Sequence, residues 1–284
     1  MLRISELKLP LDHAPDALAT LIARTLDVPT EAIASHTVYK RSFDARKVDL
    51  LTVYICDVQL ADAALEAALL AKHASHPHIQ PAPDMRYTPP GQAPADATRP
   101  VVIGFGPCGI FAALMLAKMG FKPIVLERGK TVRQRTRDTW GLWRKSVLNP
   151  ESNVQFGEGG AGTFSDGKLY SQIKDPRFLG RKVMEEFVKA GAPPEILYVA
   201  HPHIGTFKLV KVVENIREQI VALGGEIRFE QRVTDVHIEN DHLRGLTVLD
   251  QTTGRRSELR ADHVVMALGH SSRDTFEMLH ARGV

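Results

Sequence analysis

The chain has few cysteines and little excess charge of either sign. Only Cys56 and Cys108 occur among its 284 residues, so cysteine supplies neither a disulfide framework nor a metal cage, and we predict no metal site. The formal net charge is +3, which does not call for nucleic acid or an anionic membrane as a partner. So few cysteines indicate a reducing compartment, and we expect a cytoplasmic protein.

Long apolar runs are also missing. No stretch approaches the length of a transmembrane helix, and the charges scattered through Met1–Lys8 are unlike a secretory signal. The apolar share of 44 % is still sufficient to build the cores of one large or two modest domains. We therefore expect a globular protein with no membrane partner.

Proline and small polar residues separate the chain into two parts. Residues 75–98 include Thr88-Pro-Pro-Gly91, and this composition predicts an extended linker between a small domain, residues 1–74, and a larger one, residues 99–284. Periodicity in the small domain predicts an α+β fold with the order βαββα. The expected strands are Arg3–Lys8, Thr37–Phe43 and Leu50–Val58, and the expected helices are Asp16–Leu26 and Asp62–His73.

One segment of the small domain leaves a second function open. Residues 39–47 hold four basic residues around an aromatic residue, a pattern that occurs in RNA-binding surfaces. Acidic residues elsewhere in the domain balance this charge, so we favour a solvated hairpin turn and disfavour a nucleic-acid partner. A non-catalytic nucleotide-binding or RNA-binding regulatory module remains the alternative to an enzyme.

The most informative motif lies at the start of the larger domain. The apolar run that begins at Val101 predicts a buried parallel strand, and Gly104, Gly106 and Gly109 follow it with the spacing Gly-x-Gly-x-x-Gly. The first glycine permits a tight turn and the second lets backbone N–H groups approach a pyrophosphate. The third lets the next helix pack close to the strand. Cys108 lies inside this turn. We interpret it as a small residue at the helix start and disfavour the alternative, a reactive thiol near a flavin.

An acidic residue completes the motif. A helix over Ile110–Met119 leads to a second apolar strand that ends at Glu127, whose carboxylate can accept hydrogen bonds from ribose hydroxyls. An acid at this place favours a ribose with a free 2′-hydroxyl, and so FAD or NAD over NADP, which carries a 2′-phosphate. Arg128, which could accommodate such a phosphate, follows directly and weakens this inference only slightly. The motif predicts a site for the ADP half of a dinucleotide.

The sequence after Arg128 departs from a plain NAD domain. Residues 130–224 form an insertion that begins with a helix over Val132–Ser146, in which we expect Trp140 and Trp143 to form the buried side. The basic residues of this helix are expected on a solvated face, and the alternative is contact with a phosphorylated substrate. They are Arg133, Arg135, Arg137, Arg144 and Lys145.

A glycine-rich loop follows the basic helix. Gly157, Gly159, Gly160 and Gly162 permit backbone conformations that other residues resist, and can expose consecutive N–H groups to an anion or a ring. We predict that this loop faces a cofactor. Further on, we expect a helix from Thr206 to Leu223, a strand over Glu226–Val233, a meander, and a buried strand over Ala261–Gly269 whose final glycine suits close approach of a ligand.

Taken together, these segments resemble the glutathione-reductase-like FAD superfamily. Residues 153–169 and 267–279 are similar to uncharacterised FAD-dependent dehydrogenases that carry a small N-terminal α+β domain. The resemblance implies an α/β fold, with a Rossmann-like FAD-binding domain that has a parallel sheet and a β-meander crossover. We expect a FAD-dependent oxidoreductase that passes hydride through the flavin, with an unknown substrate and with NAD(P)H as a candidate electron donor. A NAD-dependent dehydrogenase is a further alternative.

The resemblance implies a place for each part of FAD. The pyrophosphate lies over the glycine turn, the ribose on Glu127, the adenine near Val233 and the flavin toward the loop at Gly159-Gly160. The predicted cofactor-binding residues are Gly104, Gly106, Pro107, Cys108, Gly109, Glu127, Arg128, Gly159, Gly160, Gly162, Val233, Ala267 and Gly269. No catalytic residue is assigned, and the candidates for an assisting side chain are Asp166, Lys168, His201, His203 and His270.

Members of the superfamily continue past the last strand described above. They form a substrate domain and return with a Gly-Asp pair that holds the ribitol, whereas this sequence stops at Val284. From the resemblance we expect a domain that is incomplete at its C-terminus and binds FAD weakly. Self-association, or association with a missing C-terminal portion, is the corresponding expectation for partners.

Overall fold

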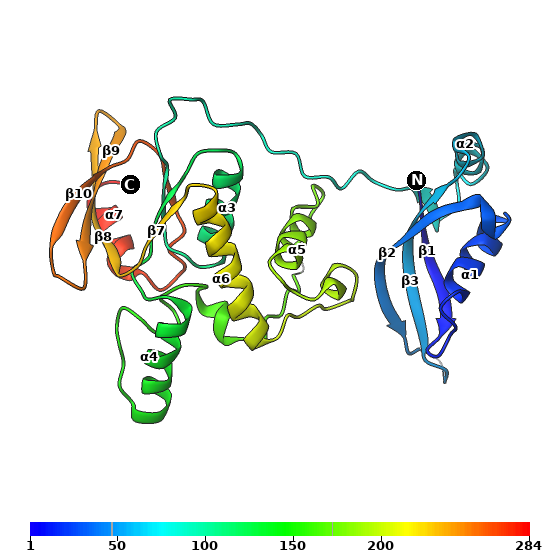
Figure 1. Cartoon of the computed structure of the whole chain (residues 1–284), viewed down its shortest axis with the longest axis horizontal. Helices are drawn as coiled ribbons and strands as arrows, with labels where there is room; N and C mark the ends of the chain where they lie inside the picture. Colours follow the sequence, from blue (N-terminus) through cyan, green and yellow to red (C-terminus); the bar gives the residue numbers. More distant parts are fainter. Residues whose placement is uncertain (47, 172) are drawn as a thin grey trace. The chain divides into compact units, whose positions relative to one another are not determined.

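The computed structural model describes residues 1–46, 48–171 and 173–284, which form two compact units (Figure 1). The first consists of Met1–Tyr87, Leu169–Glu185 and Pro193–Pro202, and the second of Thr88–Lys168, Glu186–Ala192 and His203–Val284. The insertion predicted over 130–224 is therefore divided between the two units and does not belong to the larger domain alone. Lys47, at the end of the basic segment, lies outside the described residues.

The first unit contains a four-stranded antiparallel sheet with the order β2-β3-β1-β4. The order βαββα predicted from periodicity is confirmed within it. The elements are β1 (Leu2–Pro10), α1 (Ala17–Leu26), β2 (Ile33–Asp44), β3 (Leu51–Leu60), α2 (Ala63–Lys72) and β4 (Ile79–Pro81).

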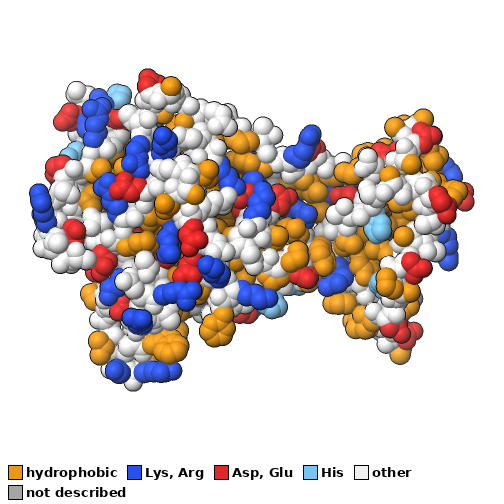
Figure 2. All heavy atoms as spheres, viewed as in Figure 1, with side chains coloured by type: hydrophobic (Ala, Val, Ile, Leu, Met, Phe, Trp, Pro, Cys, Tyr) orange, Lys and Arg blue, Asp and Glu red, His pale blue; other side chains and the backbone are white. Residues whose placement is uncertain are grey.

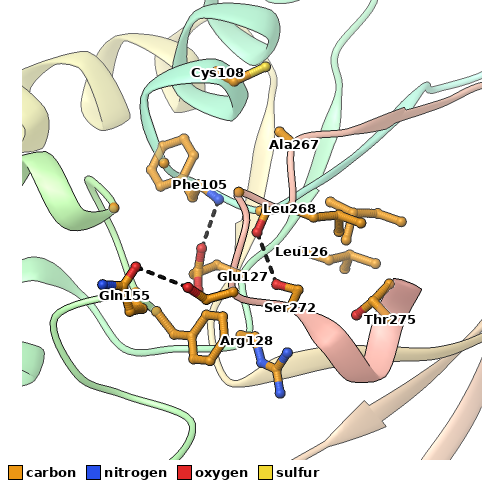
Figure 3. A pocket seen from close by; sticks show the side chains of 18 of the residues that line it. Phe105, Cys108, Leu126, Glu127, Arg128, Gln155, Ala267, Leu268, Ser272 and Thr275 are labelled. Carbon is orange, nitrogen blue, oxygen red and sulfur yellow. Dashed lines mark hydrogen bonds between the residues drawn. The ribbon is translucent and has the colours of Figure 1, made fainter. Parts of the chain in front are cut away.

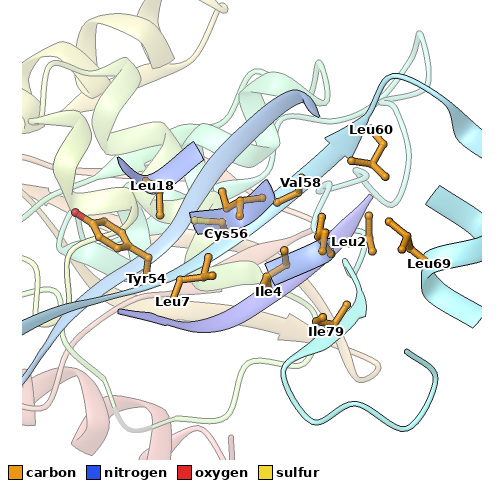
Figure 4. Close-up of a cluster of buried hydrophobic side chains, with 12 residues drawn as sticks. Leu2, Ile4, Leu7, Leu18, Tyr54, Cys56, Val58, Leu60, Leu69 and Ile79 are labelled. Atoms are coloured by element: carbon orange, nitrogen blue, oxygen red, sulfur yellow. The ribbon is translucent and has the colours of Figure 1, made fainter. Parts of the chain in front are cut away.

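The core of this sheet follows from the period of two along its strands. Leu2 and Ile4 of β1 and Cys56 and Val58 of β3 are completely buried, and Figure 4 shows them gathered with residues from both helices. Burial raises the pKa of the Cys56 thiol to about 12.

The predicted linker over residues 75–98 is not wholly an extended connection. Ile79 is buried and pairs with Ile4, so β4 extends the sheet beyond β1. Three residues are too few for a periodic signal, and Pro81 is tolerated because β4 is an edge strand. At the opposite edge, the backbone of Arg41 in β2 bonds with Tyr198 and Ala200, so part of the insertion pairs with this strand.

The second unit is built on a four-stranded parallel sheet with the order β11-β5-β6-β7, which confirms the predicted α/β class. An antiparallel sheet of β8, β9 and β10 follows it. The strands are β5 (Val101–Ile103), β6 (Ile124–Leu126), β7 (Glu226–Arg228), β8 (Gln231–Glu239), β9 (His242–Asp250), β10 (Arg256–Arg260) and β11 (Val264–Met266). The helices are α3 (Pro107–Lys118), α4 (Val132–Lys145), α6 (Thr206–Ala222) and α7 (Arg273–Ala281), while α5 (Leu179–Lys189) belongs partly to each unit.

Two strands of this unit differ from the expectation. The strand predicted over Glu226–Val233 is interrupted, because Glu230 adopts a left-handed φ of 56° and β8 then joins the antiparallel sheet. The last strand is only Val264–Met266, after which the chain turns along the end of the sheet. Among the described residues, no helix is both long enough and apolar enough to cross a bilayer.

Helix α4 buries a different face from the one that was predicted. Its buried residues are Val132, Arg135 and Thr139, whereas Trp140 and Trp143 are 48 % and 60 % exposed. Figure 2 shows apolar and basic side chains together on the surface over α4. The prediction of a buried tryptophan side is wrong because carbonyl groups of the following loop bind Arg135, and this turns the aromatic stripe outward.

Candidate functional site

A cavity of about 270 Å³ opens in the second unit at the carboxyl ends of three parallel strands (Figure 3). Its wall includes Gly104 and Phe105 after β5, Glu127 and Arg128 after β6, and residues 267–272 after β11. The carboxyl ends of parallel strands are where ligands of open α/β sheets bind.

All the predicted cofactor-binding residues except Gly109 and Gly159 line this cavity. The structure thus brings together residues from the glycine turn, the second strand, the loop and the last strand. Their role as FAD ligands stays a prediction, but their convergence on one cavity was not guaranteed by the motif.

The glycine turn is built for close backbone approach. Gly104 has a φ of 97°, and a Cβ on it would lie 2.4 Å from the carbonyl oxygen of Ala267. A Cβ on Gly109 would lie 1.9 Å from the carbonyl oxygen of Gly104, so Gly109 lets α3 begin directly against the turn. Gly109 therefore lies behind the cavity wall and supports it.

Helix α3 begins at the edge of the cavity. Gly106 is its N-cap and Pro107 its first residue, and the amide groups of a first helical turn have no partners within the helix. Such an end attracts anions. Cys108, which we interpreted as a small residue at the helix start, is exposed and lines the cavity, so its thiol is available there.

Glu127 is buried, with only 4 % of its surface exposed, and its side chain is held in place. Its Oε2 accepts a hydrogen bond of 2.7 Å from the amide of Phe105 (Figure 3), and its Oε1 accepts one of 2.7 Å from the amide of Gly129. A carboxylate offers about four acceptor positions, so each oxygen can also accept a ligand hydroxyl. The motif predicts the acid but not the two amides that orient it.

The glycine loop contributes in a different way from that predicted. The amides of Glu158, Gly159 and Gly160 already donate to the carbonyl oxygens of Lys130, Phe105 and Gly157, at 3.0, 2.8 and 3.0 Å. The expectation of N–H groups open to a ligand is therefore wrong at Gly159 and Gly160.

What the loop provides is contact with the glycine turn. Gly160 has a φ of 61°, and a Cβ on it would lie 3.0 Å from Cδ of Pro107 and 3.1 Å from Cα of Gly106. Gly159 faces away from the cavity, because a Cβ there would lie 2.1 Å from Oγ1 of Thr163. The loop thus packs against the glycine turn and forms part of the cavity wall.

The candidate catalytic side chains do not gather at this site. His270 lines the cavity, with Nδ1 3.4 Å from Oγ of Ser271, which donates to Oε1 of Gln155 at 3.2 Å. Asp166 and Lys168 form an exposed ion pair of 3.8 Å and do not line the cavity.

The two remaining histidine candidates also lie off the cavity wall. His203 pairs with Lys168 through an isolated β-bridge. His201 belongs to the first unit, where its ring packs edge-on against Tyr170 with centroids 4.4 Å apart.

Several residues that line the cavity were not predicted as site residues from the sequence motifs. They are Ile103, Phe105, Leu126, Gln155, Phe156, Ala161, Gln231, Arg232, Leu268, Ser271, Ser272 and Thr275. Most are neighbours in sequence of predicted residues, so extending each motif by a few positions would have found them. Gly157 also lines the cavity and belongs to the loop that was predicted to face a cofactor. No sequence signal marks the distant ion-pair partners that fix the cavity edge.

An ion-pair network fixes the edge of the cavity beside Glu127. Arg128 donates to both carboxylate oxygens of Glu151 and to both of Asp274, and Arg232 donates to Glu151 as well. The Arg128 guanidinium also lies 4.2 Å from the centre of the Phe156 ring. These contacts join β6, β8 and α7 around the cavity.

Comparison with known families assigns the second unit. Residues 97–278 match the model of the FAD binding domain, and the chain belongs to this family. Residues 1–59 match a domain of unknown function. An uncharacterized protein of Clostridium beijerinckii is 41 % identical over 283 residues, and the match covers 100 % of this chain and 51 % of that protein. The chain therefore spans about half the length of this relative.

Two solved structures align with part of the chain. THI4 of Thermovibrio ammonificans has 18 % identity and a TM-score of 0.43, and the match covers 78 % of this chain and 69 % of that one. The 3-ketosteroid-delta4-(5alpha)-dehydrogenase of Rhodococcus jostii has 14 % identity and a TM-score of 0.37, covering 62 % and 48 %.

Proposed function

We propose that the cavity binds FAD and that the protein is a FAD-dependent oxidoreductase, with NAD(P)H as electron donor and a small organic molecule as substrate. The observation that carries this proposal is the placement of Glu127. Its buried carboxylate is fixed by two backbone amides beside a Gly-x-Gly-x-x-Gly turn, inside the region that matches the FAD binding domain. This arrangement supports recognition of an adenosine ribose followed by a pyrophosphate.

The residues of the cavity fit the parts of FAD. The amides that open α3 would hold the pyrophosphate, Glu127 the ribose hydroxyls, and Val233 would lie beside the adenine. Gly104 and Gly160 leave no room for a side chain, which keeps the backbone close to the cavity. When bound, the flavin supplies the hydride-transfer chemistry, and the protein supplies binding, orientation and exclusion of water.

Polar side chains at the end of β11 are suited to orient a reacting molecule. His270, Ser271 and Gln155 form a connected group on the cavity wall. We propose that this group orients the substrate or the donor, because its hydroxyl, imidazole and amide can donate and accept hydrogen bonds.

The enzymatic part of the proposal is tested by anaerobic reduction. Purified protein saturated with FAD is mixed with NADH or NADPH, and the flavin band at about 450 nm is followed. We expect bleaching by at least one of the two donors, followed by return of the band when an organic acceptor or oxygen is added. A colourless protein that binds RNA at moderate salt would support the regulatory-module alternative instead.

Cys108 allows an independent test of where FAD binds. Its thiol is exposed on the cavity wall at the start of α3, so saturating FAD is expected to slow its alkylation by iodoacetamide by about tenfold or more, in line with occupancy by a ligand at many times its Kd. The site of modification is read by mass spectrometry. Cys56 is the internal control, because it is buried and burial raises its pKa to about 12, so it should stay unmodified with or without FAD. Equal labelling of Cys108 in both conditions would place FAD elsewhere.

A further inference from the structure

Among the residues that the structure describes, Arg135 is the largest completely buried side chain, and it extends from α4 into the glycine loop. Its guanidinium donates hydrogen bonds to five carbonyl oxygens of the backbone. These belong to Asn153 at 3.1 and 2.8 Å, Val154 at 2.9 Å, Gly157 at 3.0 Å, Glu158 at 2.6 Å and Gly160 at 3.0 Å.

The buried cation of Arg135 is balanced by carbonyl groups of the backbone, whereas buried cations are usually paired with a carboxylate. Among the described residues, every hydrogen-bond acceptor of Arg135 is a backbone carbonyl, and no carboxylate forms an ion pair with it. Burial lowers the pKa of Arg135 to about 10, and the charges of Glu127 and Glu158 oppose this shift, so the group is charged at neutral pH. A buried charge is tolerated when its donors are satisfied, and here the carbonyl dipoles satisfy them.

The loop is shaped around this side chain. A Cβ on Gly157 would lie 2.6 Å from Cδ of Arg135, so only glycine lets the loop pass so close. Glu158 adds a second anchor, because its carboxylate accepts from the amide of Val132 at 2.7 Å and from Arg217 of α6 at 2.8 and 2.9 Å.

The carbonyl groups that bind Arg135 are directed away from the cavity. Arg135 itself does not line the cavity, whereas Gly157, Gly160 and the start of the following turn, Ala161 and Gly162, do. Five carbonyl oxygens of the loop are thus engaged by Arg135, and an unengaged carbonyl oxygen at the cavity would repel an anionic pyrophosphate or an electron-rich ring.

We propose that Arg135 is a positioning residue for FAD. Its guanidinium binds the carbonyl groups of residues 153–160 and so holds Gly160 against the start of α3. The loop then presents an uncharged, close-fitting surface to the cofactor. This inference rests on the proposed binding of FAD. It predicts that Arg135 contributes to the binding of the half of FAD that extends past the glycine turn. Arg135 should not affect the binding of the adenosine half, which is held at Glu127.

The test compares two ligands in Arg135→Lys. Lysine keeps the charge but cannot bind five carbonyl oxygens at once. We expect the Kd for FAD to rise about tenfold or more, since several charge-assisted hydrogen bonds are lost, while the Kd for AMP changes by less than about twofold. In Arg135→Ala, millimolar guanidinium should restore part of the FAD affinity. Arg133→Ala is the matched control, because Arg133 lies on the same helix, is paired with Glu214 and makes none of these loop contacts.

The outcomes separate the two levels of the proposal. If the unaltered protein binds no FAD, the proposed function fails. If it binds FAD and Arg135→Lys binds FAD equally well, the positioning role is overturned. Equal losses for AMP and FAD, or loss of folding in both Arg135 variants, would make Arg135 a structural residue and would also overturn the inference.

Discussion

Replacement of Gly160 by valine is expected to reduce FAD affinity by about a hundredfold or more without unfolding the protein. Gly160 has φ 61° and ψ −165°, a region that only glycine occupies freely, and strain there costs about 1–3 kcal/mol. A Cβ would also lie 3.0 Å from Cδ of Pro107, and overpacking costs a further ~1–3 kcal/mol. The loop can relieve both only by moving off the glycine turn, which removes one wall of the cavity.

The measurement is the Kd for FAD together with the melting temperature of the protein without ligand. Gly254→Val is the matched control, because Gly254 also has a positive φ, 71°, but lies in the turn between β9 and β10 with no atom within 4 Å of its Cβ position. We expect a lower melting temperature and unchanged FAD affinity in the control. If Gly160→Val lowers only the melting temperature, and flavin content per folded molecule stays constant, the loop is structural.

Glu127→Gln is expected to weaken FAD about ten- to a hundredfold, because a hydrogen bond to a charged group contributes roughly 1.5–3 kcal/mol. The substitution keeps the shape of the side chain. One of its two polar atoms must nevertheless become an NH₂ group that faces the amide of Phe105 or of Gly129, so the orientation of the side chain is disturbed as well. AMP should weaken in parallel with FAD, unlike in the Arg135 variants.

Titration of both ligands by calorimetry checks this prediction. Glu226→Gln provides the control, since Glu226 is an acid on the neighbouring parallel strand that pairs with Arg99 and Arg228 and does not line the cavity. Unchanged affinity in Glu127→Gln for both FAD and AMP would remove Glu127 from the site.

The parts of the fold that were predictable are those with a local signal. Residues two apart in β1 and β3 are buried together, and the apolar run at Val101 is a buried parallel strand. The strand β4 was missed because three residues carry no periodic pattern. The division of the insertion between two units depends on pairing between Arg41 and Val199, which are far apart in sequence and leave no mark in either segment.

The candidate site shows the same limit. Gly104, Gly106 and Glu127 were predictable as residues of one cavity, because the dinucleotide-binding motif places these residue types at a fixed spacing after parallel strands. The orientation of α4 was not predictable, because two tryptophans outweigh an arginine in any pattern of hydrophobicity. Only the carbonyl groups of the folded loop reveal that Arg135 is the residue that is buried.

The central claim, that the cavity beside Glu127 binds FAD, is tested most directly by titrating the purified 284-residue chain with FAD and following the flavin band at about 450 nm and its fluorescence. The account predicts saturation at one FAD per chain, competition by AMP, and loss of that saturation in Gly160→Val. Absence of saturable binding, or binding that neither AMP nor the Glu127 and Gly160 substitutions affect, would contradict it.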